Sequence, residues 1–262
     1  MSLRRGALWL LVGLTLAAAA VLARPGASYS YQDREATLAG SSLRHPAGTD
    51  DLGRDRLARV SAALLISLTG SIAAAAITTA AAAGVGTLAA FGPEVVGWGA
   101  MLGCDVFLAL PWMFLLMMVR STLPLTTSPG HSAAVTFLVL AALGWPACAR
   151  AVYRGALAQR TSGWMLHARA TGLHRGQMIR HLLPNLFPLL IPQFLVSIPA
   201  FVIAEANLGA LGLGISEPLP SWGGMLFELN NSAMLLQTRW VYFPLALLIV
   251  VLLALEGAAA EA

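Results

Sequence analysis

The chain alternates between long apolar runs and shorter polar segments, and six of the runs are long enough to cross a bilayer. A helix that crosses the hydrocarbon core needs about 20 mainly apolar residues. Runs near that length cover residues 6–23, 61–91, 95–119, 133–149, 186–204 and 240–255. The pattern therefore predicts an all-α polytopic membrane protein with six transmembrane helices.

Two of these runs have compositions that bear on packing. The second is rich in Ala and contains Gly70, Gly84 and Gly86, and small residues let helix backbones approach closely in lipid. We therefore expect it to be a tightly packed internal span. The fifth run contains three prolines, and the carbonyls that they free must be satisfied by neighbours or water. A helix that lines a pathway and a kinked packing helix both meet this condition.

The start of the chain is compatible with two structures. The first run follows Arg4 and Arg5 and ends in small residues, so it fits either a retained anchor helix or a secretory signal. A polar segment, residues 24–60, follows with six Arg and five acidic residues. With the N-terminus inside, eight Arg lie on each side of the membrane. The acid-free loop at 150–180 favours this orientation, because excess Arg marks the cytoplasmic side.

The composition excludes several chemistries. The sequence is 58% hydrophobic and 11% charged, against about 25% charged in a soluble domain. All basic residues are Arg, so neither a phosphate-binding P-loop nor a Schiff-base lysine is present. If the protein uses ATP, another chain must bind it. Cys104 and Cys148 both fall in apolar runs, where packing is the expected role.

A strongly basic segment interrupts the apolar pattern at residues 164–185. Its sequence is WMLHARATGLHRGQMIRHLLPN, and no Asp or Glu occurs from 106 to 204. Such a segment must lie at the membrane surface, where it either offers a cationic helical face to another protein or rests on anionic lipid. We expect Gly172 to turn the chain between two short helices and Pro184 to end the second.

No catalytic or metal-binding constellation stands out. His167, His174 and His181 recur every seven residues, which in a helix separates them by about 10 Å, too far to share an ion with bonds of about 2 Å. We therefore predict no metal site. The sequence has no His-Glu-x-x-His, no Gly-x-Ser-x-Gly and, within one apolar segment, no paired carboxylates, so we predict no catalytic residues and no cofactor. Arg-rich stretches could attract nucleic acid, but their place beside six membrane spans argues against such a partner.

Two acidic residues fall within or next to apolar runs, where charged groups are candidates for function. Asp105 lies in the third run and either serves a pathway or gate or bonds a neighbouring helix. Glu205 follows the fifth run and either caps the next turn or meets a binding protein. Beyond it, the glycine-rich stretch 209–214 and Trp222 suggest a short element that plugs the outer mouth, with the Trp at the lipid–water interface.

Short motifs occur in order along much of the chain. They are His45-Pro-Ala-Gly-Thr-Asp50-Asp-Leu-Gly53-Arg54-Asp55, Asp105-Val-Phe-Leu-Ala-Leu-Pro111, Gly144-Trp145-Pro146 with Ala149-Arg150, Ala168-Arg-Ala-Thr-Gly172, Ile179-Arg-His-Leu-Leu-Pro184-Asn185, Ala204-Glu205-Ala206, Leu211-Gly212-Leu213-Gly214 and Pro220-Ser221-Trp222-Gly223. In this order and spacing the chain resembles the inner-membrane permease subunits of ABC importers for dipeptides, oligopeptides and nickel. The resemblance covers about 210 residues, from His45 to near the C-terminus.

The resemblance implies a topology and a set of partners. Both termini would be cytoplasmic and the first helix retained, with an anchor and polar segment at 1–60, a five-helix core at 61–262 and a docking loop at 150–185. The partners would be a second homologous permease, two ABC ATPase subunits and an extracytoplasmic solute-binding protein. The function implied is ATP-driven import of short peptides by alternating access, with nickel or another small solute as alternatives; the subunit itself is not an enzyme.

The resemblance also implies roles for particular residues. The ATPase-coupling set is Leu166, His167, Ala168, Arg169, Ala170, Gly172, Arg175, Ile179, Leu183 and Pro184. The set in the translocation pathway or gate is Asp105, Pro111, Glu205, Leu211, Gly212, Gly214 and Trp222. The chain departs from the family where the docking loop usually begins Glu-Ala-Ala, because Leu166, His167 and Ala168 stand there. A basic residue common in the family three before the third-helix Asp is replaced by Leu102. A non-transporting scaffold and an intramembrane enzyme are the alternatives.

Overall fold

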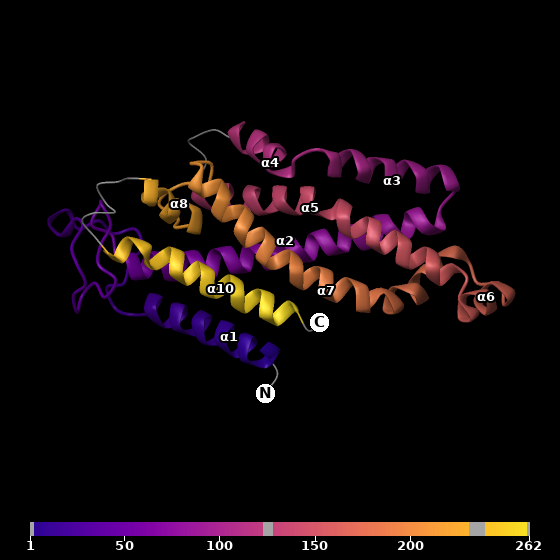
Figure 1. Ribbon diagram of the computed structural model, residues 1–262, viewed down its shortest axis with the longest axis horizontal. Coiled ribbons are helices and arrows are strands. Elements are labelled where there is room, and N and C mark those ends of the chain that lie inside the picture. The colour runs from indigo at the N-terminus through magenta and orange to yellow at the C-terminus, as the bar shows by residue number, and fades with distance from the viewer. Residues whose placement is uncertain (1–2, 123–127, 231–238, 261–262) are drawn as a thin grey trace.

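The computed structural model describes residues 3–122, 128–230 and 239–260, without the side chains of Leu3, Arg169, Arg175, Leu183 and Arg239. Its long helices lie roughly side by side in an elongated bundle (Figure 1). The α-helices are α1 (Leu3–Leu22), α2 (Arg56–Phe91), α3 (Glu94–Ala109), α4 (Trp112–Ser121), α5 (Pro129–Arg160), α6 (Gly163–Ala170), α7 (Arg175–Ala210), α8 (Trp222–Phe227) and α10 (Phe243–Ala259). The 3-10 turns are η1 (Arg34–Ala36), η2 (Glu228–Asn230) and η3 (Arg239–Tyr242).

The number of spans agrees with the apolar pattern. Five helices are long and apolar enough to cross a membrane, and a sixth span results if α3 and α4 are counted together. The all-α polytopic prediction is therefore confirmed.

The packing of α2 confirms that the Ala-rich run is a close-packed internal span. Its largest contact is with α5, and it also packs on α7 and α1. Gly86 leaves room for Val152 of α5, because a Cβ on this glycine would lie 2.7 Å from the Val152 Cβ. Thr78 adds a cross-helix hydrogen bond by donating to the Ala141 carbonyl at 3.0 Å. Small side chains thus bring α2 and α5 into backbone contact.

The third span is broken, where the apolar pattern predicted one continuous helix. The axes of α3 and α4 differ by 80° at a break that contains Leu110 and Pro111. Proline has no N–H to continue the helical ladder, and it disfavours a helical conformation of the residue before it. Leu110 is indeed extended, with ψ of 135°.

The helix that follows the basic turn is longer than expected. The prediction that Pro184 ends a short helix is wrong, because α7 runs without interruption from Arg175 to Ala210 and contains Pro184, Pro188, Pro192 and Pro199. Proline removes one ladder bond but does not oblige a helix to end when neighbours hold it. Contacts with α2, α5, α8 and α10 provide that support.

The polar segment 24–60 covers one end of the bundle, next to α8 (Figure 1). At the opposite end, α6 projects beyond the other helices. The turn at Gly172, called the docking turn after its expected role, and the region of Glu205 and Trp222 therefore lie at opposite ends of the molecule. The helix α7 runs from one to the other.

Candidate coupling and gating sites

At the α6 end, the chain forms a helix–turn–helix around Gly172. Gly172 has a φ of +81°, a left-handed conformation that favours glycine. The sequence prediction of a turn at this residue is confirmed. Met165 of α6 is fully buried with Met178 and Leu182 of α7 in one hydrophobic cluster, so α6 is packed against the first turns of α7.

The first turn of α7 is capped by side chains. The His174 N–H donates to Oε1 of Gln177 at 3.0 Å, completing a capping box. Nearby, Arg160 at the end of α5 donates to the Ala90 carbonyl at 2.9 Å and lies over the Phe91 ring. The Arg160 contacts fix the ends of α2 and α5 relative to each other.

The predicted coupling residues are distributed over both faces of this turn. Leu166, His167, Ala170 and Pro184 are exposed, whereas Ala168 and Ile179 are half-buried. The side chains of Arg169, Arg175 and Leu183 lie outside the described part. The exposed surface of α6 therefore presents the apolar side chain of Leu166 next to the imidazole of His167.

Asp105 forms an ion pair across two helices. Its Oδ1 lies 2.7 Å from Nη1 of Arg150 on α5, so the contact to a neighbouring helix is observed. Both side chains remain partly exposed, at 54% for Asp105 and 37% for Arg150. Sequence reasoning placed Arg150 in the basic loop and in the motif that ends with Ala149-Arg150, but it missed the pair, because 45 positions separate the two residues.

Glu205 is fully buried near the other end of α7. Its Oε2 accepts a hydrogen bond from Ser67 of α2 at 2.8 Å, and the Ser221 side chain and Gly223 backbone also face the carboxylate. Of the two roles expected for Glu205, direct contact with a binding protein is incompatible with this burial. The carboxylate instead joins α2, α7 and the start of α8.

Three glycines make the contact between α7 and α8 very close. A Cβ on Gly223 would lie 2.5 Å from the Ala206 carbonyl oxygen and closer still to Gly209 Cα. A Cβ on Gly214 would lie 2.6 Å from the same Gly209 Cα. We call residues 209–227 the outer plug, after the position that the sequence predicts for them. Within it, Gly212 has a φ of +78° and Leu211 is exposed.

Trp222 occupies a different environment from the predicted one. It is fully buried in the main hydrophobic core, so the expectation of a lipid–water interface position is wrong. The close glycine contacts draw α8 into the bundle, and the indole then fills the space beside it. Composition alone does not reveal which side of a short turn faces inward.

Arg120 ties the outer plug to the end of α4. Its Nε donates to the Leu213 carbonyl at 2.9 Å, and Nη2 donates to the Gly214 carbonyl and to Oγ of Ser132 at 3.1 Å. Ser132 Oγ also accepts the Ser216 N–H at 3.1 Å. Sequence reasoning used Arg120 only to judge orientation, although an Arg at the end of an apolar run is a signal for such a role.

A buried ion cluster joins the polar segment to the outer plug. Asp50 Oδ2 lies 2.6 Å from Arg54 Nε and 3.5 Å from Arg59 Nε. Glu217 pairs with the same two arginines at 2.8 Å and 2.9 Å. Asp50 is 1% exposed and Arg59 2%, while Glu217 is 56% exposed. The cluster therefore runs from the protein interior to the surface, and we call these four residues the outer latch.

A second pair extends the latch toward η2. Arg56 Nη1 lies 3.1 Å from Glu228 Oε2. Burial raises the pKa of the Glu228 carboxyl, and the Arg56 charge opposes this shift. The sequence signal for the outer latch and for the Arg56–Glu228 pair was the charged stretch 50–59, which directly precedes an apolar run.

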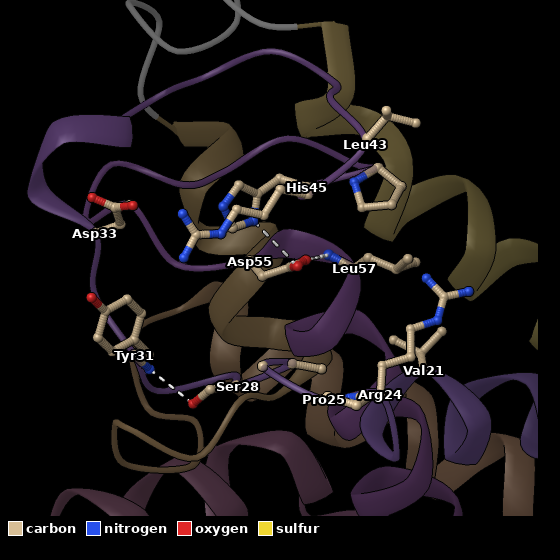
Figure 2. A pocket seen from close by; sticks show the side chains of 15 residues that line it. Val21, Arg24, Pro25, Ser28, Tyr31, Asp33, Leu43, His45, Asp55 and Leu57 are labelled. Carbon is tan, nitrogen blue, oxygen red and sulfur yellow. Dashed lines mark hydrogen bonds and ion pairs between the residues drawn. The ribbon is translucent and has the colours of Figure 1, made fainter.

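The polar segment also encloses a pocket of about 270 Å³. Figure 2 shows His45 and Asp55 at its centre, with Tyr31, Ser28 and Arg24 around them. His45 Nδ1 lies 3.3 Å from Asp55 Oδ2, and Asp55 Oδ1 accepts the N–H groups of Leu57 and Ala58 at the start of α2. Asp55 thus fixes where the second span begins.

Comparison with known proteins identifies the family. Residues 82–259 match the family described as binding-protein-dependent transport system inner membrane component. This segment contains the docking turn, the Asp105–Arg150 pair and the outer plug. The chain belongs to this family.

Known proteins resemble this permease over most of its length. A putative peptide permease protein of Brucella suis biovar 1 is 31% identical over 226 residues, covering 86% of this chain and 73% of the relative. The glutathione transport system permease protein GsiD of Escherichia coli O1:K1 is 31% identical over 247 residues, covering 91% and 78%. A Brucella ovis putative peptide permease protein is 30% identical over 226 residues, covering 86% and 73%.

Membership fixes the general role of this permease. It is a multi-pass inner-membrane transport component and not an enzyme, and it works with ATPase and solute-binding components. The sequence contains no lysine, so it holds no phosphate-binding P-loop.

Proposed function

We propose that this permease forms half of the translocation pathway of an ATP-driven importer for short peptides or a related small solute. Its relatives include putative peptide permeases and a glutathione transport permease, which supports this solute class. The other half would be a second homologous permease, with two ATPase subunits on the cytoplasmic side and a solute-binding protein outside.

The observation that carries this proposal is the continuity of α7. One helix of 36 residues, about 54 Å long at 1.5 Å per residue, joins the turn at Gly172 to the outer plug. A rigid helix transmits displacement from one end to the other. Closure of the ATPase dimer against α6 would thus move the plug directly.

The proposed orientation places the α6 turn, Arg150 and both termini in the cytoplasm. The acid-free arginines of residues 150–180 support it, because excess Arg marks the cytoplasmic side. The outer plug, outer latch and polar segment then face the solute-binding protein. We retain the division into an anchor and polar segment at 1–60 and a five-helix core at 61–262 as part of this proposal.

The proposed coupling surface is the exposed side of α6 together with the start of α7. Its members are Leu166, His167, Ala168, Arg169, Ala170, Gly172, Arg175, Ile179, Leu183 and Pro184. Leu166 is 53% exposed on a helix that the bundle holds firmly, and an exposed apolar side chain of this kind suits a groove in a partner. The proposed gate consists of Glu205 and the outer plug, which contains Leu211, Gly212, Gly214 and Trp222. Asp105 and Pro111 are proposed to serve the translocation pathway.

The experiment is purification of the complex in mild detergent with the variant Leu166→Arg and the control Leu43→Arg. Leu43 is a fully exposed leucine of the polar segment. We expect Leu166→Arg to co-purify with at most about one tenth of the ATPase that the wild type retains. A tenfold loss corresponds to about 1.4 kcal/mol of binding free energy. The control should retain the wild-type amount.

Two results would contradict the proposal. Equal recovery of ATPase with both variants would remove α6 from the coupling surface. Recovery of ATPase whose hydrolysis is not stimulated by binding protein and dipeptide would favour the non-transporting scaffold instead.

A further inference from the structure

A groove of about 320 Å³ opens where the third span is broken. Aromatic and aliphatic side chains from α3, α4, α5 and α7 line most of it, among them Phe107, Trp112 and Phe201. Its polar members are Gln193 and Ser197 of α7. Gln193 Nε2 lies 3.4 Å from Ser197 Oγ, and in the described part of the chain no other side chain bonds this amide.

The groove lies at membrane depth. Gln193 and Phe201 are 17 and 9 residues before the outer end of α7 at Ala210. At about 1.5 Å per residue these positions are about 14 to 26 Å below that end. A hydrocarbon core of about 30 Å includes this range.

Lipid is a poor neighbour for this groove. The break between α3 and α4 frees backbone carbonyls from the helical ladder, and Leu110 and Trp112 on either side of it are exposed. Irregular backbone is tolerated at this depth only where protein or water covers it. A half-buried glutamine amide at the same place adds to that requirement.

A charged pair continues the same face toward the α6 end. Asp105 lies five residues before Leu110 on α3, and its partner Arg150 follows Pro146 and Ala147 on α5. The Phe107 and Trp145 rings, with centroids 5.9 Å apart, lie on these same two helices. The partly exposed ion pair and the groove therefore share the α3–α5 face.

A tightly packed subunit contact is also a poor neighbour. Charged residues are depleted from the centres of protein interfaces, which pack as densely as protein interiors. Here a half-exposed ion pair stands beside the groove. A water-lined groove would satisfy the carbonyls, the amide and the ion pair together.

We propose that this groove is the chain's wall of an aqueous solute passage, in which apolar solute side chains contact Phe107, Trp112 and Phe201 while Gln193 bonds solute amide groups. This rests on the proposed function and adds to it a preference for amphipathic solutes such as short peptides with apolar side chains.

The first test measures water access with single cysteines. Cys104 and Cys148 are replaced by Ala, and Ala147→Cys or Ala200→Cys is introduced at exposed positions of the groove. Ala17→Cys, exposed on the peripheral helix α1, is the matched control. Membrane vesicles of both orientations that contain the whole transporter are treated with a membrane-impermeant trimethylammonium methanethiosulfonate.

We expect both groove cysteines to react at least about tenfold faster than the control from one side, because the reactive thiolate forms only in contact with water. Reaction no faster than the control from either side would overturn the proposal. Cross-linking of these cysteines to a second permease in place of reaction would overturn it as well.

The second test measures solute size in reconstituted transporter with Ala200→Trp and, as control, Ala17→Trp. We expect the uptake ratio of dileucine to dialanine to fall about tenfold with Ala200→Trp, since lost space in an apolar pocket discriminates side chains to that extent. An unchanged ratio would contradict the proposed contacts. Failure of the proposed function would give a different result, namely loss of ATPase from the wild-type complex. Cysteine reactivity does not depend on ATP, so it tests the groove separately.

Discussion

At Gly223 the chain has no room for a methyl group, since a Cβ there would collide with the backbone of α7 at Ala206 and Gly209. We expect Gly223→Ala to lower the free energy of unfolding by about 1–3 kcal/mol, as for other overpacked sites. Thermal unfolding in detergent measures the effect. The control is Gly84→Ala in α2, where a Cβ meets nothing within 4 Å and a small gain of about 0.5–1 kcal/mol is expected. Equal stability of the two variants would show that the plug adjusts freely.

The outer latch offers a second test on single residues. Asp50 is buried and contacts both Arg54 and Arg59, so Asp50→Asn leaves two buried cations with only Glu217. Removing one partner of a buried ion pair costs about 3–5 kcal/mol, and we expect an unfolding free energy lower by about that amount. The neighbouring exposed Asp51 provides the control, because Asp51→Asn should change stability by less than about 0.5 kcal/mol. A similar small change at both positions would mean that the cluster does not stabilise the fold.

Single residues also show what the sequence reveals and what it conceals. Gly172 was predicted to turn the chain because glycine adopts backbone conformations that interrupt a helix. The partner of Asp105 was not predicted, since Arg150 lies on another helix and only the bundle brings them together. Trp222 was expected at the lipid–water interface, and contact with a binding protein was one of two roles left open for Glu205. Tertiary packing buries both residues.

Among the elements, the turn between α6 and α7 is the most direct test of coupling. Gly172 is left-handed, a conformation that costs an L-residue about 1–2 kcal/mol, so Gly172→Ala should distort the turn. We expect solute-stimulated ATP hydrolysis by the complex to fall about fivefold, as for an equilibrium shifted by about 1 kcal/mol.

The matched control for this turn is Gly176→Ala. Gly176 is four residues further on, inside α7, and a Cβ there meets nothing within 4 Å. Its stimulated rate should equal that of the wild type. If both variants hydrolyse ATP at the wild-type rate, the shape of the turn is not what transmits the motion.

The elements themselves were largely predictable, and their continuity was not. Apolar length locates the spans because burial in lipid demands it. Proline is ambiguous, because the same residue type breaks the third span at Pro111 and passes unbroken through α7 at Pro184 and three further positions. The difference depends on neighbouring helices, which no local pattern contains.

For the whole molecule, Arg120 connects the passage side to the outer plug through two carbonyls and Ser132. We expect Arg120→Gln to loosen the plug and to raise ATP hydrolysis in the absence of binding protein about fivefold, the effect of about 1 kcal/mol on the closed state. The control is Arg34→Gln at an exposed arginine of the polar segment. Unchanged hydrolysis with Arg120→Gln would show that the plug does not influence the ATPase cycle.

The unbroken course of α7 also constrains how this protein can vary in length. Each residue added to a helix rotates everything beyond it by about 100° and advances it by about 1.5 Å. One inserted alanine between Pro188 and Pro199 would therefore turn Glu205 away from Ser67 while leaving α6 where it is. Insertions and deletions in this stretch are tolerable only when their length is close to a whole number of helical turns. The two ends of the helix must therefore keep a fixed rotation about their shared axis.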